Sequence, residues 1–138
     1  MASPITSNMG IPSCSVMVGG KDMGATYGIK SIVVTKEINK VSKARIIIMD
    51  GNPSDETFDA SASKDFDPDK VISIKMGYNQ KEQEVFSGVI TGHSLKVRFR
   101  SSELVLTCMD KAFQLATTRK TTNFVKKKDS DVISEIIG

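Results

Sequence analysis

The sequence is poor in the residues that build most catalytic and metal sites. Its 138 residues include no tryptophan, one histidine and two cysteines, and aromatic residues make up only 6%. With one histidine and no Cys-x-x-Cys pair, a structural zinc site is not expected. Gly-x-Ser-x-Gly and His-Glu-x-x-His motifs are also missing, and no carboxylate pair sits on a defined scaffold. We therefore expect a protein that is not an enzyme and that uses no cofactor, metal or small-molecule substrate.

The few potentially reactive side chains have ordinary structural interpretations. His93 follows a glycine in a strand pattern and has no nucleophile motif nearby, which indicates a surface or hydrogen-bonded histidine. Cys14 and Cys108 lie in apolar strand patterns, so both are predicted to be small buried hydrophobes. A disulfide between them stays open at this stage.

Long apolar runs are missing as well. No stretch approaches the ~20 residues that span a bilayer. The N-terminal residues 1–12 lack the cationic and apolar regions of a secretory signal and are predicted to form a flexible polar arm. We expect synthesis and assembly in the cytoplasm. The chain length, with 39% hydrophobic and 25% charged residues, predicts one domain over residues 1–138.

What the sequence does have is strand periodicity, which is clearest in residues 71–107. Ile72, Ile74, Met76 and Tyr78 alternate with small or polar residues, a pattern typical of a half-buried strand. Further strands are predicted at 85–91, at 95–100 with an apolar and a basic face, and at 104–108 with both faces buried. The polar segments 79–83 and 101–103 are predicted turns. Connections this short require antiparallel neighbours.

Two glycines interrupt the most apolar part of this meander. Gly88 and Gly92 each cost about 0.5–1 kcal/mol relative to alanine in a strand, so we expect bulges or sharp bends there. Bent strands allow a sheet to curl and close. The predicted fold class is therefore mainly β, an antiparallel β-barrel with one or two short helices.

The remaining elements are assigned from local signals. Strands are predicted at 13–18, 29–38 and 44–49, with a hairpin turn at residues 19–22. A long acidic connection, residues 54–69, is predicted to contain a helical turn near 55–58. Asp110 is expected to cap a short helix, and Asp129 or Ser130 a final amphipathic helix.

Two motifs that resemble ligand sites are rejected. The Gly-Gly-Lys-Asp at residues 19–22 lacks the glycine spacing and hydroxyl residue of a phosphate loop. Asp65, Asp67 and Asp69 resemble the start of a calcium loop, but Lys70 replaces its glycine and Met76 its bidentate glutamate. Residues 67–70 are better interpreted as a turn before the next strand.

Charge is separated along the chain even though the net charge is only +3. The middle is acidic and the C-terminal part is basic, which suits head-to-tail packing between copies or with a partner, although a simply solvated surface gives the same pattern. The candidate interface residues are Asp65, Asp67, Asp69, Lys96, Arg98, Arg100, Arg119, Lys120, Lys126, Lys127 and Lys128.

The basic residues also raise the alternative of a small nucleic-acid-binding β-barrel. Lys96, Arg98 and Arg100 form one basic strand face, and Lys126 to Lys128 add a patch. That face lacks interleaved aromatic residues for base stacking, because Tyr78 and Phe86 fall at expected core positions. Nucleic acid is therefore not the partner that we expect.

Several segments in order resemble a known family. These are Phe86-Ser87-Gly88-Val89-Ile90-Thr91, residues 104–112 (LVLTCMDKA), Thr118-Arg119-Lys120 and residues 130–137 (SDVISEII). Together they resemble the N-terminal hub domain of VgrG-type (Rhs-element Vgr) spike proteins, related to phage late-control protein D. The resemblance covers residues 29–138.

The resemblance implies a β-barrel of the tail-tube type that acts as a structural hub in a contractile injection machine. In full-length members a trimeric hub joins the inner-tube ring to the spike, exported at the tip of the machine. No catalytic residues come with it. The second barrel, neck and needle of such members have no counterpart here, so we expect a fragment of a longer protein. Phage tails, type VI-like secretion systems and extracellular injection particles stay open, as does a tube-like adaptor with another tail partner.

Overall fold

A computed structural model describes residues 10–51, 57–79, 81–98, 101–117, 119 and 121–137. The chain forms one seven-stranded antiparallel sheet in the order β2-β1-β5-β6-β7-β4-β3. The strands are β1 (Pro12–Val18), β2 (Lys21–Asp22), β3 (Ile29–Thr35), β4 (Lys43–Asp50), β5 (Val71–Tyr78), β6 (Lys81–Val97) and β7 (Ser102–Met109). The helical elements are α1 (Asp59–Ala62), the 3-10 turn η1 (Lys64–Phe66), α2 (Phe113–Thr117) and α3 (Asp129–Ile137).

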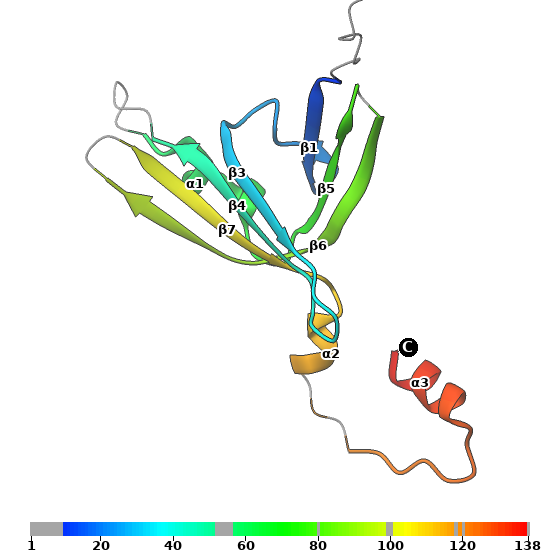
Figure 1. Ribbon diagram of the computed structural model, residues 1–138. Coiled ribbons are helices and arrows are strands. Elements are labelled where there is room, and N and C mark those ends of the chain that lie inside the picture. The colour runs from blue at the N-terminus through cyan, green and yellow to red at the C-terminus, as the bar shows by residue number, and fades with distance from the viewer. Residues whose placement is uncertain are drawn as a thin grey trace, which may run out of the picture.

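The mainly-β antiparallel prediction is confirmed, with one difference. β2 and β3 are the two ends of the strand order and do not pair with each other, so the sheet of the described residues is bent but not closed. Figure 1 shows a V, with β1, β5 and the start of β6 in one arm and β3, β4, β7 and the end of β6 in the other.

The long strand β6 produces this bend. Its first part pairs with β5, and from Val89 onward it pairs with β7. The register shifts between Ile90 and Gly92, so Thr91 is the extra residue of a bulge. The predicted bend next to Gly92 is therefore present, but the strand continues through it, where the sequence predicted separate strands at 85–91 and 95–100.

Gly88 does not form a bulge. It allows the backbones of β6 and β7 to approach each other closely. A Cβ atom at this position would lie 2.2 Å from the carbonyl oxygen of Met109 and 2.9 Å from the Phe86 ring. No side chain fits there without a backbone shift, because such contacts are far inside van der Waals distance. The absence of a side chain is what brings β6 and the end of β7 together.

The core lies between the arms of the V. Antiparallel partners point to the same face, and Val16, Ile74 and Phe86 are aligned and buried in one arm. In the other arm Ile46 and Leu106 are aligned and buried. The buried side chains form one cluster: Val16, Val18, Met23, Ala44, Ile46, Ile48, Ala60, Phe66, Ile72, Ile74, Phe86, Ile90, Leu104, Leu106 and Cys108.

The connection between β4 and β5 covers part of this core. Phe66 is buried there and meets the Tyr27 ring edge-on, with 5.0 Å between the ring centroids. Asp50 holds α1 in place, because its carboxylate accepts hydrogen bonds from the backbone N–H groups of Ala60 (3.0 Å) and Ser61 (2.8 Å). The helical turn begins at Asp59, later than the predicted 55–58; residues 55 and 56 lie outside the described part.

Of the two cysteines predicted to be buried, one is buried and one is exposed. Cys108 is buried, and burial raises the pKa of its thiol to about 12. Cys14 is exposed instead, because it lies on β1 near the open side of the sheet, and both cysteines are free thiols. Tyr78 was also placed wrongly in the core: its side chain, at the end of β5, is 66% exposed.

The hairpin turn between β1 and β2 and the cap by Asp110 are confirmed, whereas the predicted cap at Asp129 or Ser130 is not, because α3 already begins at Asp129. Gly19 and Gly20 have φ values of 56° and 87° and connect β1 to β2, as two-residue hairpin turns require. Asp110 Oδ1 accepts a hydrogen bond from the Ala112 N–H at 2.9 Å before α2. The strands extend further into the predicted polar turns than expected, since β6 begins at Lys81 and β7 at Ser102.

Candidate partner interfaces

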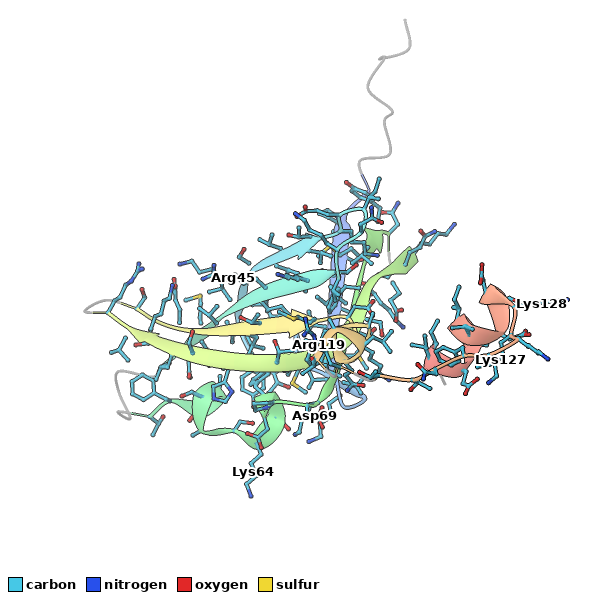
Figure 2. The ribbon with its side chains drawn as sticks, turned by 90° about the horizontal axis from the view of Figure 1, so that it is seen from below. Arg45, Lys64, Asp69, Arg119, Lys127 and Lys128 are labelled. Carbon is cyan, nitrogen blue, oxygen red and sulfur yellow. The ribbon has the colours of Figure 1, made fainter. Side chains whose placement is uncertain are left out.

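The structure divides the predicted basic residues between two surfaces. Lys96 and Arg98 lie exposed at the far end of β6, whereas Arg119, Lys127 and Lys128 lie beyond α2 at the other end of the molecule (Figures 1 and 2). Lys126 precedes Lys127 and has a positive φ of 56°. Arg100 and Lys120 lie outside the described residues. The described basic residues therefore do not form one continuous face.

The first of these surfaces is organised around a buried carboxylate. Glu103 on β7 is paired in register with Lys96 on β6 and forms an ion pair with Lys30 on β3. The hydrogen bond from Lys30 lowers the pKa of Glu103, and the positive charges of Arg98 and Lys96 act in the same direction. Since three cations surround one anion, the surface keeps a net positive charge.

This surface is the outer face of the β3-β4-β7-β6 arm, on the opposite side from the core. Arg45 lies on the same face, aligned with Thr107, and is labelled in Figure 2. Val33 and Met49 also point outward and are exposed. We call Lys30, Arg45, Lys96, Arg98 and Glu103 the basic sheet face.

The acidic candidates have different environments. Asp65 in η1 is engaged within the chain: its carboxylate accepts a hydrogen bond from the Tyr27 hydroxyl (3.3 Å) and lies 3.6 Å from the Lys21 ammonium. Desolvation opposes ionisation of Asp65, but the Lys21 charge and the hydrogen bonds outweigh it and lower the pKa. Asp65 therefore ties η1 to the β1–β2 hairpin.

Asp67 and Asp69, by contrast, are exposed in the turn that leads into β5. Asp69 has a φ of 74°, and its N–H donates to the carbonyl oxygen of Ile90 at 2.8 Å. Within the described ranges neither carboxylate takes part in an ion pair. These two residues are the acidic candidates whose charges face solvent.

Among the described residues, the open sheet leaves two free strand edges. There, β3 pairs with β4 alone, and β1 pairs with β2 only through Met17 and Val18. A cleft of about 470 Å³ lies between them, with Cys14 and Met76 on one side and Ile29 and Ile32 on the other. Free backbone edges of this kind can pair with another strand.

The C-terminal arm, residues 121–137, lies away from the sheet in both views (Figures 1 and 2). None of the residues of α3 is buried. Lys127 forms an ion pair with Glu135 and lies 5.6 Å from the centre of the Phe124 ring. The predicted helix is confirmed, but its apolar side has no partner in the described structure.

His93 lies close to the backbone of the β4–β5 connection. His93 Nδ1 is 3.2 Å from the carbonyl oxygen of Phe66, so its ring has the hydrogen-bond partner that the sequence led us to expect. In the part of the chain that the structure describes, no group of three or more His, Cys, Asp or Glu side chains is placed to hold a metal. No described helix is long and apolar enough to cross a bilayer.

With this geometry in view, comparison with protein families gives a match over nearly the whole chain. The profile of the Alg8 N-terminal domain matches residues 8–138. The chain belongs to this family. A comparison with curated proteins gave no match.

Two solved structures show that the Alg8 N-terminal domain described here has a phage-tail protein fold. The tail protein from Neisseria meningitidis MC58 is similar at a TM-score of 0.52 and 18% identity, over 75% of this chain and 26% of that one. The 43 kDa tail protein of prophage MuSo2 from Shewanella oneidensis is similar at a TM-score of 0.55 and 14% identity, over 78% and 31%. The chain therefore spans about a quarter to a third of these tail proteins.

Several residues of the basic sheet face and of the free strand edges were not predicted from the sequence. Glu103 was assigned to a turn, and Lys30 was not singled out, because their pairing crosses β4 and depends on strand order. The only local signal was an ionisable residue beside the buried run that starts at Leu104. The free edges of β1 and β3 have no local signal, since edge position is a property of the assembled sheet.

Proposed function

We propose that this chain is a structural hub domain of a contractile injection machine, of the VgrG and late-control protein D type, that docks the inner-tube ring and connects it to the spike. The observation that carries the proposal is a tail-protein fold in which the described strands leave two sheet edges free. Tail and hub rings assemble through contacts between subunits, and free edges with an adjacent cleft supply such contacts.

The charge distribution supports the same role. The basic sheet face and the exposed Asp67 and Asp69 belong to different surfaces of one subunit. Rings use heterologous contacts between two different faces of the same subunit, and opposite charges on these faces favour one orientation. We propose that the partners are further copies, a trimer in the full-length protein, and the inner-tube ring protein with baseplate and spike proteins.

Binding to the cognate inner-tube protein tests the proposal. We expect capture of the tube protein by the immobilised chain, and weaker capture after Lys96→Glu with Arg98→Glu or after Lys126→Glu, Lys127→Glu and Lys128→Glu. Lys75→Glu, an exposed lysine on the other arm of the sheet, is the matched control. Added salt should weaken binding, because exposed charges are screened over about 8–10 Å at 0.1–0.15 M.

Two outcomes would count against parts of this proposal. Capture of the tube protein that is unchanged by charge reversal and by salt would show that the charged surfaces do not contribute to binding. A gel shift with single-stranded nucleic acid that is lost on charge reversal of the same lysines, without capture of the tube protein, would support the nucleic-acid-binding alternative.

A further inference from the structure

The C-terminal helix α3 has an apolar stripe that faces solvent. Ile133, Ile136 and Ile137 are 56%, 55% and 64% exposed, and they share one side of the helix with Val132. Most of the stability of a helix in a protein comes from the packing of its apolar face, and none of the residues of α3 is buried. The stripe therefore indicates a docking surface that the isolated subunit leaves uncovered.

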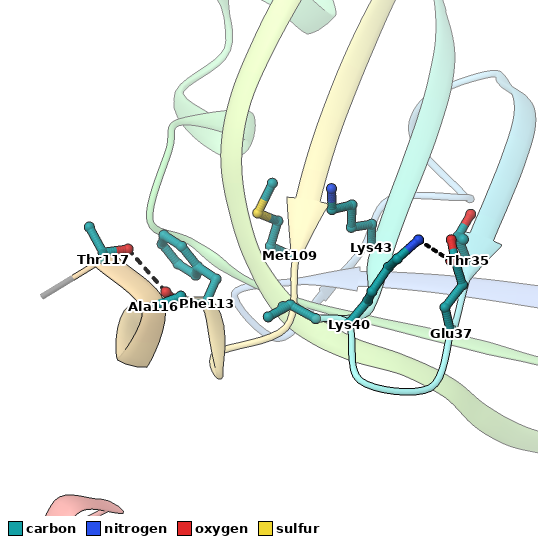
Figure 3. A pocket seen from close by; sticks show the side chains of 9 residues that line it. Thr35, Glu37, Lys40, Lys43, Met109, Phe113, Ala116 and Thr117 are labelled. Atoms are coloured by element: carbon teal, nitrogen blue, oxygen red, sulfur yellow. Dashed lines mark hydrogen bonds and ion pairs between the residues drawn. The ribbon is translucent and has the colours of Figure 1, made fainter.

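A groove at the narrow end of the V offers a matching surface. It has a volume of about 450 Å³ and lies between α2 and the turn that joins β3 to β4 (Figure 3). Val41, Met109, Phe113 and Ala116 supply apolar wall. Lys40, Lys43 and Glu37 also line the groove (Figure 3). Close to it in the chain, Ile38 and Leu115 are exposed as well.

The charges of the two surfaces are complementary in part, because Glu37 also lines the groove and Glu135 of α3 already pairs with Lys127. The acidic residues of α3 are Asp129, Asp131 and Glu135, and the helix contains no basic residue. The groove carries Lys40 and Lys43, although Lys40 also pairs with Glu37. An amphipathic helix entering this groove would bury the isoleucines against Met109 and Phe113 and bring Asp129 and Asp131 towards Lys43.

We infer that α3 docks into this groove of a second copy of the chain. The eleven residues between Thr117 and Asp129 span at most about 36–40 Å when extended, enough to reach a neighbouring subunit. In both views the arm carries α3 away from the body of its own subunit (Figures 1 and 2). Arm exchange of this kind is a low-cost route to assembly.

The contact joins two different surfaces, so it is heterologous and passes from copy to copy until a ring or an open chain forms. It requires neither the strand edges nor the basic sheet face. The inference therefore stands independently of the proposed hub function: a variant that loses self-association and still captures the tube protein would separate the two.

Light scattering after size-exclusion chromatography provides the first test. The wild-type chain should rise from its monomer mass of 15.0 kDa towards multiples as concentration increases. Ile133→Asp with Ile136→Asp, and separately Ala116→Glu in the groove, should keep the mass at 15.0 kDa. Val97→Asp, at an equally exposed apolar site far from both surfaces, is the control and should associate like wild type. A wild-type chain that stays monomeric at every concentration would overturn the inference.

Cysteine cross-linking then shows which copy supplies the helix. In a Cys14→Ser background, mixing one chain with Ile136→Cys and another with Ala116→Cys should give a disulfide-linked heterodimer under mild oxidation. Replacing Ile136→Cys by Val97→Cys should abolish it. A chain carrying both cysteines that closes on itself, with no heterodimer from the mixture, would place α3 in its own groove and overturn docking in a second copy.

Discussion

The ammonium of Lys30 on β3 donates a hydrogen bond to the carboxylate of Glu103 on β7, across the intervening strand β4. A register irregularity between Ile29 and Ser31 leaves Lys30 without a strand partner. The Lys30 side chain then contacts the carboxylate of Glu103, a residue that is only 7% exposed. The edge strand β3 is thus fastened to the centre of its arm by a side-chain contact as well as by the backbone ladder.

This contact predicts a pH-dependent stability. The pKa of Glu103 is lowered from its ordinary value of 4.5, so the pair stabilises the native state above that pH and the contribution is lost as the pH falls through the lowered pKa. We expect Lys30→Met to lower the melting temperature at pH 7 and to flatten the change in stability below pH 4.5. Lys40→Met, which removes an exposed i, i+3 pair, should change neither. Equal thermal melts of the two variants from pH 3 to 7 would contradict the assignment.

The close approach of β6 to Met109 predicts opposite behaviour for two glycines. Gly88→Ala should destabilise the chain by about 1–3 kcal/mol or more, because the added Cβ meets a backbone carbonyl that cannot rotate away. Gly92→Ala adds its Cβ to open space and should be neutral, or stabilising by up to about 1 kcal/mol. Urea unfolding of both variants measures the difference, and a Gly88→Ala chain as stable as Gly92→Ala would show that the strands can separate locally.

The β4–β5 connection is predicted to be part of the core. Phe66→Ala should cost about 3–5 kcal/mol, because it removes a buried ring and its contact with Tyr27. Tyr78→Ala, at an exposed aromatic position, should cost less than about 1 kcal/mol. Denaturant melts provide the measurement. If Phe66→Ala is as mild as Tyr78→Ala, the connection does not cover the core in solution.

Asp50 is predicted to fix α1 through its charge and its two oxygens. Asp50→Ala removes the acceptors of the Ala60 and Ser61 N–H groups and should cost about 1–2 kcal/mol. Burial opposes ionisation, but these hydrogen bonds outweigh it and lower the pKa of Asp50 below 3.8, so the effect should persist at pH 5 and fade at lower pH. Amide hydrogen exchange of Ala60 and Ser61 reports it directly. Asp59→Ala, in the exposed first turn of α1, is the control and should leave both amides protected.

The sequence alone determined the features that depend on neighbouring residues. Alternation of apolar and polar residues predicted β5 and most of the other strands, the glycine pair predicted the β1–β2 turn, and Asp110 predicted the start of α2. Each follows from backbone preferences and side-chain period over a few positions. Short sequence segments of the same local kind also carried the resemblance to hub proteins.

Only the tertiary structure decided features that depend on which strands become neighbours. β6 continues through its bulge because β5 and β7 pair with its two halves, and Cys14 and Tyr78 are exposed because they lie near the ends of strands on the open side of the sheet. Lys30 finds Glu103 across β4 for the same reason. Strand order, edge position and burial are set by contacts between residues far apart in the chain, which local periodicity cannot encode.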